Sequence, residues 1–182
     1  MTCIVGLEYN GGVVIGGDVQ GTGHNNKIVH TQPKVFNKRG IIFGFTTSYR
    51  FGQLLEHALP DPVIPDDPDE IYRWLITVIV PSIKSTLKDN GYDGGGNCLI
   101  GVKDQLWELQ NDFSVLRSVK GYGSVGSGYE YATGCLFSKL TSLPESEITY
   151  PIARAAVQQA ILAAGTFSPT VGTDSVVINT QL

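Results

Sequence analysis

The first 19 residues contain the pattern that most limits how this chain can fold. Two runs rich in Val and Ile, at residues 3–9 and 13–19, flank the tripeptide Asn-Gly-Gly at residues 10–12. β-Branched residues favour extended strands, and a short glycine-bearing loop between two strands closes a β-hairpin. The sequence therefore predicts an antiparallel hairpin, with Asp18 at the end that lies far from the turn.

The rest of the chain alternates between strand-like and helix-like patterns. After a polar stretch at residues 21–26, residues 35–36 and 41–45 predict a second hairpin that would complete an N-terminal meander. Further strands are expected at residues 98–102, 106–109, 114–120 and 175–179, and helices at residues 48–60, 69–90, 129–140 and 151–164. This order predicts a single α+β domain over residues 1–182, in which antiparallel sheets are faced by layers of helix.

The composition argues against several classes of protein. A chain of 182 residues that is 42% hydrophobic and 16% charged has enough apolar surface for one globular core. The net charge is −4 and the longest basic run is Lys38-Arg39, so we expect no nucleic-acid partner. The apolar stretch at residues 74–80 is far shorter than the roughly 20 residues of a membrane span, and no secretory signal is visible.

The cysteines and histidines give no sign of a bound metal. Neither set has the spacing of metal ligands, and the cysteines contain no CxxC pair. The residues concerned are Cys3, Cys98, Cys135, His24, His30 and His57. We therefore expect no metal, no other cofactor, no disulfide framework, and a reducing cytoplasmic location.

Thr2 becomes a candidate nucleophile if Met1 is removed, as initiator methionines before small residues ordinarily are. An alcohol needs a neighbouring base to take its proton, and an N-terminal threonine carries its own base, the α-amine. The α-amine titrates near ~7.7–8.0, so a modest push from a nearby cation would leave it largely neutral at cellular pH. Removal of one residue would thus create a reactive centre.

Four segments of the chain match one family pattern. They are TCIVG at residues 2–6, GGVVIGGD at 11–18, PKV at 33–35 and SVGSG at 124–128. These segments resemble the proteasome β-subunit and HslV peptidase family of N-terminal-nucleophile (Ntn) hydrolases, and the resemblance spans nearly the whole chain. It implies a four-layer αββα sandwich of two antiparallel sheets flanked by helices. Short phage and actinobacterial chains that open with the same MTCIV-type sequence are also similar.

The resemblance implies a role for each matching residue. Thr2 would attack the scissile carbonyl with its own amine as base, Lys34 would hold that amine neutral, and Asp18 would keep Lys34 charged. The sequence IIFGF at residues 41–45 is similar to the family's oxyanion segment, so the Gly44 N–H is expected to face the developing oxyanion.

The resemblance also assigns supporting residues, with one departure. Ser127, in the SVGSG turn, and Ser168 match the serines that assist the amine. Gly165 stands where the family has an aspartate, and Asp174 lies too far along the chain to replace it in an obvious way. The supporting network is therefore expected to be weaker than in the family, with Thr2, Asp18 and Lys34 intact.

Substrate and assembly are likewise implied by the resemblance. The pocket positions for the residue before the cut correspond to Gly21, Gln32, Ile42 and Thr46, an uncharged set that suggests apolar or small side chains. We expect a peptide or unfolded protein substrate, cut inside a homo-oligomeric ring that is fed by an ATPase unfoldase.

Alternative interpretations remain at this point. The same fold serves a catalytically inactive structural or regulatory ring protein, or an Ntn amidase that acts on a small molecule. Cys3 would be a rival nucleophile only if Thr2 were removed as well. Residues 121–126 match GxGxxG, but one such match without a parallel βαβ unit is weak evidence for a dinucleotide site.

Overall fold

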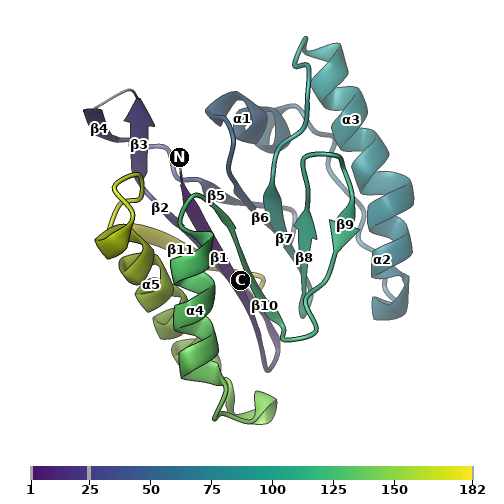
Figure 1. Cartoon of the computed structure of the whole chain (residues 1–182). Helices are drawn as coiled ribbons and strands as arrows, with labels where there is room; N and C mark the ends of the chain where they lie inside the picture. The colour runs from purple at the N-terminus through teal and green to yellow at the C-terminus, as the bar shows by residue number, and fades with distance from the viewer. Residues whose placement is uncertain (1, 24–25, 182) are drawn as a thin grey trace.

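The computed structural model describes residues 2–23 and 26–181, and it places two sheets between two layers of helix (Figure 1). The first sheet has the strand order β10 (Tyr122–Gly126), β1 (Cys3–Tyr9), β2 (Gly12–Asp18) and β11 (Ser175–Asn179). The second sheet has the order β5 (Val35–Lys38), β6 (Ile41–Phe45), β7 (Cys98–Val102), β8 (Gln105–Leu109) and β9 (Val115–Leu116). Neighbouring strands in both sheets are antiparallel. A separate ribbon is formed by β3 (Gln20–Gly23) and β4 (Asn26–Val29).

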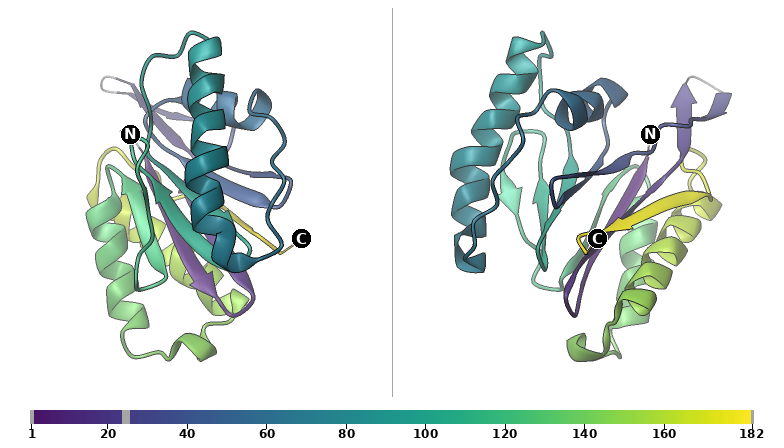
Figure 2. Two further views of the ribbon diagram at one scale, coloured as in Figure 1. Left: turned by 90° about the vertical axis from the view of Figure 1, so that its right-hand side faces the viewer. Right: turned by 180° about the vertical axis from the view of Figure 1, so that it is seen from behind.

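The helices cover the outer faces of the two sheets, as the views in Figure 2 show. The first sheet is covered by α4 (Tyr129–Leu140) and α5 (Tyr150–Phe167). The second is covered by α1 (Tyr49–His57), α2 (Ile71–Trp74) and α3 (Val80–Asp89). Short 3₁₀ turns lie at Pro68–Glu70 and Glu145–Glu147. The predicted α+β class and its αββα layering are confirmed.

The alternation of side chains along each strand explains these layers. In β1, Cys3, Val5 and Leu7 pack under the α4 and α5 helices, whereas Ile4 points between the two sheets. Successive strand residues face opposite sides, so one strand supplies two separate cores. The central core between the sheets is aliphatic and includes Ile15. The strands of the first sheet are therefore apolar on both faces, because one face contacts the helices and the other contacts the second sheet.

The predicted N-terminal meander is wrong. The β1–β2 hairpin pairs with β10 and β11, while the β5–β6 hairpin belongs to the other sheet and pairs through β6 with β7. The strands at residues 98–116 therefore extend the second hairpin and do not form a set of their own. Each hairpin is closed by a local turn, but the first pairs through both of its strands, and the second through β6, with strands that are distant in sequence. The short-range alternation of side chains does not specify these partners.

Three further elements differ from the sequence-based expectation. Tyr122–Gly126 forms β10, which includes the first three residues of the expected SVGSG turn at 124–128, whereas the strand expected at 114–120 is confined to Val115–Leu116. The polar stretch at 21–26 is largely strand, and His24 lies outside the described residues. Because β10 is antiparallel to β1, the GxGxxG match does not belong to a dinucleotide-binding βαβ unit.

The long helix expected over residues 69–90 changes its winding in the middle. Between α2 and α3, Leu75–Ile79 forms a π-helix, and Pro81 follows in the first turn of α3. Proline has no N–H for the helical ladder, and its ring crowds the preceding turn. A widened turn accommodates that crowding without ending the helix.

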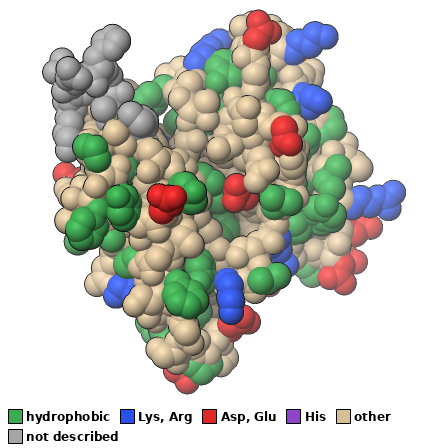
Figure 3. Space-filling model, in the orientation of Figure 1, with side chains coloured by type: hydrophobic (Ala, Val, Ile, Leu, Met, Phe, Trp, Pro, Cys, Tyr) green, Lys and Arg blue, Asp and Glu red, His purple; other side chains and the backbone are tan. Residues whose placement is uncertain are grey.

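The surface combines dispersed charge with exposed apolar side chains. On the face drawn in Figure 3, Lys and Arg side chains form separate spots that are interspersed with Asp and Glu. Hydrophobic side chains are exposed along α4 and α5, including Phe137 (56%) and Phe167 (67%). Of the helices in the described part of the chain, none is both long enough and apolar enough to cross a lipid bilayer.

Candidate active site

The register of the first sheet gathers three of the predicted site residues at one edge. Cys3 pairs with Gly126, and Ile4 pairs with Gly17. Thr2, immediately before β1, therefore lies beside the end of β2, at Asp18, and beside Ser127, which follows β10. Thr2 itself is 7% exposed. Residues that are distant in sequence meet here because antiparallel pairing brings the start of one strand beside the ends of its neighbours.

Asp18 and Lys34 form a buried ion pair at this edge. Lys34 Nζ lies 2.9 Å from Asp18 Oδ1, and the two side chains are 3% and 0% exposed. The same oxygen accepts the Cys3 N–H at 2.9 Å, while Oδ2 accepts the N–H groups of Gln20 (3.2 Å) and Gly172 (3.1 Å). Each carboxylate oxygen thus accepts from two donors, so the hydrogen-bonding capacity of this buried side chain is satisfied.

Lys34 is held as a desolvated cation. Burial lowers the pKa of its ammonium below the ordinary value of 10.5, and the charge and hydrogen bond of Asp18 oppose that shift. Lys34 also donates to the backbone oxygen of Gln20. An ammonium has three N–H donors, so one is left without an acceptor among the described residues. Lys34 and Thr2 line the same cavity, so this cation lies beside the predicted nucleophile.

A chain of hydroxyl groups leads away from Thr2 on its other side. The Thr2 nitrogen is 3.2 Å from Ser127 Oγ, which lies 2.8 Å from Thr170 Oγ1, and that atom lies 3.0 Å from Ser168 Oγ. The approach of the SVGSG turn depends on Gly126, whose φ is +100° and whose Cβ, if present, would lie 2.2 Å from the Thr2 carbonyl oxygen. The structure therefore brings both predicted serines into one network with Thr2.

Thr170, which the sequence did not indicate, lies on the segment that packs against Gly165. A Cβ on Gly165 would lie 2.5 Å from the Gly172 carbonyl oxygen, so backbone fills the space where a side chain would begin. Thr170 lies on the segment that occupies this space. Its place in Ser-Pro-Thr, at residues 168–170, is a weak signal, because Ser, Pro and Thr are common in any turn.

A cavity of about 290 Å³, which we call the nucleophile cavity, opens beside Thr2. Its lining comes from the β3–β4 ribbon, the start of β5 and the β6–α1 connection. The lining residues are Thr2, Gly21, Ile28, His30, Lys34, Phe45, Thr46, Thr47, Ser48 and Tyr49. Two of the predicted pocket residues, Gly21 and Thr46, are therefore in it.

The other two predicted pocket residues lie elsewhere. Gln32 is exposed in the β4–β5 connection, and Ile42 is fully buried between the sheets. Their places on the wall are taken by His30 and Tyr49, whose ring centroids are 4.8 Å apart. Burial, with a contribution from Asp18, raises the pKa of the Tyr49 phenol. Periodicity could not have found His30, because it lies in an irregular connection.

Gly44 does not line the nucleophile cavity. It sits within β6, opposite Val35 on one side and Leu99 on the other. The next residue, Phe45, donates its N–H to Lys34 O at 3.0 Å, so alternation directs the Gly44 N–H toward β7. This geometry does not support the expectation that the Gly44 N–H faces an oxyanion.

Thr47, which does line that cavity, has an unusual backbone conformation. Its φ is +75°, a left-handed conformation that is costly for a β-branched residue. Its N–H donates to no acceptor among the described residues, whereas the neighbouring Thr46 and Ser48 N–H groups are hydrogen-bonded. No sequence signal marks Thr47, because threonine does not favour a positive φ.

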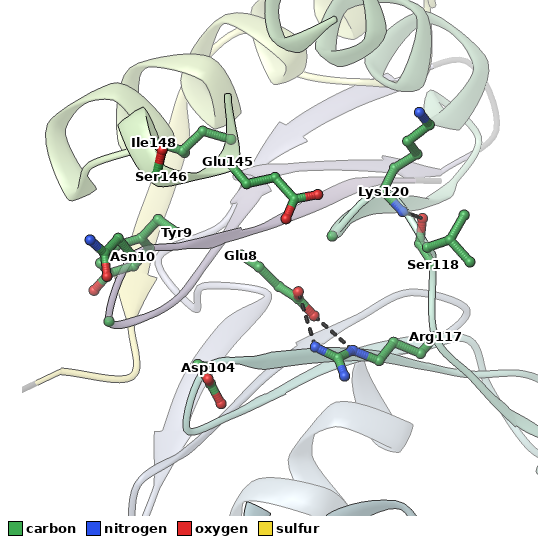
Figure 4. Close-up of a pocket in the computed structure, with 13 residues that line it drawn as sticks. Glu8, Tyr9, Asn10, Asp104, Arg117, Ser118, Lys120, Glu145, Ser146 and Ile148 are labelled. Carbon is green, nitrogen blue, oxygen red and sulfur yellow. Dashed lines mark hydrogen bonds and ion pairs between the residues drawn. The ribbon is translucent and has the colours of Figure 1, made fainter. Parts of the chain in front are cut away.

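Two other features are poor candidates for chemistry. Burial raises the pKa of the Cys3 thiol to about 12, and its side chain is 0% exposed, so it is not a nucleophile. A larger hollow of about 820 Å³, which we call the distal groove, lies at the hairpin-turn end of β1. It contains the exposed Glu8–Arg117 ion pair and the side chains drawn in Figure 4. No group of His, Cys, Asp and Glu suited to a metal ion occurs in residues 2–23 and 26–181.

Comparison with known proteins supports the architecture. No protein-family model and no curated protein matches this sequence. Among solved structures, Thiobacillus denitrificans BPH in complex with epoxomicin superposes with a TM-score of 0.80 at 18% identity, over 97% of both chains. HslV from Trypanosoma brucei gives a TM-score of 0.67 at 16% identity, over 97% of this chain and 98% of that chain. The chain has the proteasome-type Ntn-hydrolase fold.

A third structure extends this fold comparison. Anbu, the ancestral β-subunit from Yersinia bercovieri, has a TM-score of 0.71 at 13% identity, and it is covered over 81% of its length by 97% of this chain. All three structures thus share the αββα layering with this chain. At such low identity, the Ntn-hydrolase fold is what the chains have in common, and the chemistry must be argued from the residues present here.

Proposed function

We propose that this chain is an N-terminal threonine peptidase of the proteasome β-subunit type. One observation carries the proposal: a buried Lys34–Asp18 ion pair lies beside Thr2, and Lys34 lines the same cavity as Thr2. A buried ion pair is weak evidence for stability, because desolvation opposes the attraction between its charges. A desolvated cation beside a potential nucleophile, however, has a strong effect on the ionisation of neighbouring groups.

The reaction requires that Met1, which lies outside the described residues, be removed. The α-amine of Thr2 then accepts the proton of Thr2 Oγ1 while that oxygen forms a bond to the scissile carbonyl carbon. The resulting ammonium gives this proton to the departing amine as the C–N bond breaks. A water molecule, activated by the same amine, hydrolyses the remaining ester. Lys34 favours the neutral amine through its positive charge, and general acid–base catalysis of this kind contributes typically ~10²–10⁴-fold.

Stabilisation of the oxyanion is assigned to Thr47 rather than to Gly44. A donor for the oxyanion must be a free N–H that already faces the reacting carbonyl. The Thr47 N–H belongs to a residue of the nucleophile cavity and has no acceptor among the described residues. Its positive φ is the kind of backbone strain that clusters at functional sites.

The substrate and assembly follow from the same proposal. The substrate is a peptide or unfolded protein, and the chain acts within a homo-oligomeric cytoplasmic ring with an ATPase unfoldase as partner. Apolar side chains on α4 and α5, such as Leu162 and Phe167, are exposed to solvent in the single chain. Exposed apolar patches are typical of protein–protein interfaces, so these side chains support contacts between subunits. Residues 1–182 are proposed to form a single proteasome-like Ntn-hydrolase domain.

Two measurements test the proposal. Intact-mass analysis is expected to show the chain without Met1, and fluorogenic peptides are expected to be cleaved by this protein but not by Thr2→Ala. The matched control Thr141→Ala, at an exposed threonine after α4, should cleave normally. Peptidase activity that survives Thr2→Ala would refute the proposal.

A covalent probe tests the nucleophile without knowledge of the substrate. Epoxomicin, the compound in the BPH complex, is an electrophile and should add one molecule per chain to the wild type and none to Thr2→Ala. A chain that keeps Met1, reacts with no probe and cleaves nothing would be the inactive ring protein. Cleavage of small amides alone would identify the amidase.

A further inference from the structure

The segment that follows α5 contacts both sides of the reactive centre. Its Gly172 N–H donates to Asp18 Oδ2 at 3.1 Å, and its Thr170 hydroxyl lies 2.8 Å from Ser127 Oγ. Ser168, the C-cap of α5, anchors the start of the segment by donating its N–H to Ala164 O at 2.8 Å. Three consecutive residues, 170–172, therefore connect the buried ion pair to Ser127, the group that contacts the Thr2 nitrogen.

The side chains of Ser127, Thr170 and Ser168 are all neutral hydroxyls, and their neutrality affects the protonation of the Thr2 amine. A hydroxyl has one proton to donate and two lone pairs to accept. A carboxylate next to Ser127 would only accept, so it would hold the Ser127 proton and leave Ser127 as an acceptor toward the amine. That arrangement favours the ammonium form, both through the hydrogen bond and through the negative charge.

The hydroxyl network does not impose that direction. If Thr170 donates to Ser127, the Ser127 proton is free to point toward Thr2; if Ser127 donates to Thr170, Ser127 accepts from the Thr2 nitrogen. Ser127 Oγ lies 3.2 Å from that nitrogen and 3.4 Å from the Thr2 carbonyl oxygen, so both directions fit the geometry. The network therefore accommodates the neutral amine and the ammonium, the two forms between which a catalytic base alternates.

We propose that Thr170 is a positioning residue whose hydroxyl links Ser168 to Ser127, in place of the carboxylate that is missing at Gly165. Because this link carries no negative charge, it favours the neutral form of the Thr2 amine. This proposal rests on the proposed function. The backbone packed on Gly165 leaves no room for a carboxylate at that position, so the uncharged network is built into the fold.

The experiment compares four variants in the full-length protein. Thr170→Val removes the hydroxyl with little change in shape, Thr170→Ser keeps it, and Thr170→Asp introduces a negative charge. Thr166→Val is the matched control, because Thr166 is exposed on α5 and its hydroxyl donates to Leu162 O. The readouts are kcat/KM as a function of pH, and the pH dependence of α-amine acylation by an activated ester, followed by mass spectrometry.

We expect Thr170→Val to lower kcat/KM roughly tenfold, the effect of about one lost hydrogen bond, with Thr170→Ser close to wild type. Thr170→Asp should move the acidic limb of the profile and the amine titration to higher pH by about one unit. The Thr166→Val profile should match the wild type.

Different outcomes separate this inference from the proposed function. If Thr2→Ala is inactive but Thr170→Val and Thr170→Asp match the wild type at every pH, the inference is overturned and the peptidase stands. If nothing is cleaved but the amine titration responds to Thr170→Asp, the positioning role stands and the peptidase fails. A mature chain that retains Met1 has no Thr2 amine and overturns both.

Discussion

The two hollows of the molecule, the nucleophile cavity and the distal groove, each lie at an ion pair, and the two pairs differ in their exposure to solvent. In the larger one, the distal groove of about 820 Å³, Glu8 and Arg117 pair at 3.0 Å with side chains 21% and 39% exposed. In the nucleophile cavity of about 290 Å³, Lys34 and Asp18 pair at 2.9 Å with side chains 3% and 0% exposed. The distances are nearly equal, so burial is the variable that separates the two pairs.

This comparison explains why the smaller hollow is the better candidate for chemistry. Water screens an exposed ion pair, which typically contributes ~0–1 kcal/mol and has little effect on its neighbours. A buried charge acts through a medium of lower effective dielectric, so it shifts the ionisation of groups beside it. Volume alone would have selected the wrong hollow. Because β1 spans seven residues, the two sites lie about 20 Å apart along the first sheet.

Removal of the buried cation should have the largest effect. Lys34→Met should leave the Asp18 carboxylate buried without its counter-charge, destabilising the fold by about 3–5 kcal/mol. Peptidase activity should fall by ~10²–10⁴-fold, because the amine loses the field that keeps it neutral. Urea unfolding and kcat/KM at a temperature where the variant is folded measure both effects. Lys120→Met, at the distal groove, is the control. A folded and fully active Lys34→Met would contradict the assignment.

The pH dependence of activity should depend on the buried pair through the pKa of Lys34. Burial lowers the pKa of Lys34 below 10.5, so activity that needs the Lys34 charge should decline on the alkaline side before that pH. Asp18 raises this pKa, so Asp18→Asn should move the alkaline limb to lower pH. Profiles of kcat/KM against pH for both proteins, checked by circular dichroism for folding, test the sign. A limb that moves upward in Asp18→Asn would exclude Lys34 as the titrating group.

The pKa of Lys34 should also make folding stability depend on pH, but stability should rise with pH where activity falls. Because the unfolded chain binds the Lys34 proton more tightly than the folded chain does, this group's contribution to stability rises as pH increases toward 10.5. The penalty for burying the charged lysine is fully present below the folded pKa. Denaturation of the wild type at several alkaline pH values should therefore reveal a contribution that Lys34→Met lacks.

A smaller effect is expected at Thr47. Thr47→Gly should relieve the cost of a positive φ, about 1–3 kcal/mol, but it removes the hydroxyl that accepts the Asn97 N–H at 3.3 Å, worth about 1 kcal/mol. We expect a net gain in stability of up to about 2 kcal/mol, with kcat within roughly twofold because the backbone N–H is retained. Thermal unfolding and initial rates measure these quantities. A large loss of kcat would assign the role to the hydroxyl instead.

The smallest effect should come from the exposed ion pair. Arg117→Gln is expected to cost no more than about 1 kcal/mol and to leave peptide cleavage unchanged, because water screens the Glu8 charge that remains. Chemical denaturation and rate measurements under the same conditions as for Lys34→Met provide a direct comparison. A change in kcat at Arg117 would show that the distal groove communicates with the cavity.

The candidate site was predictable in part. Thr2, Asp18, Lys34 and Ser127 were found because a recognisable spacing links them, and the structure brings them to one sheet edge. Thr47, Thr170 and Tyr49 were missed, since each depends on a backbone conformation or a distant contact. Thr170, for example, lies 43 residues from its partner Ser127.

The local elements could be predicted from the order of the residues alone: the first hairpin, the helix that starts after Ser48, and the two helices of the last third. Those depend on side chains a few positions apart, which a linear pattern records directly. Three features could be known only from the folded chain: which hairpin joins which sheet, the direction of the Gly44 N–H into its sheet, and the backbone that fills the space at Gly165. Those outcomes depend on packing between segments far apart in the chain, where strand register and available volume exclude alternatives that every local pattern permits.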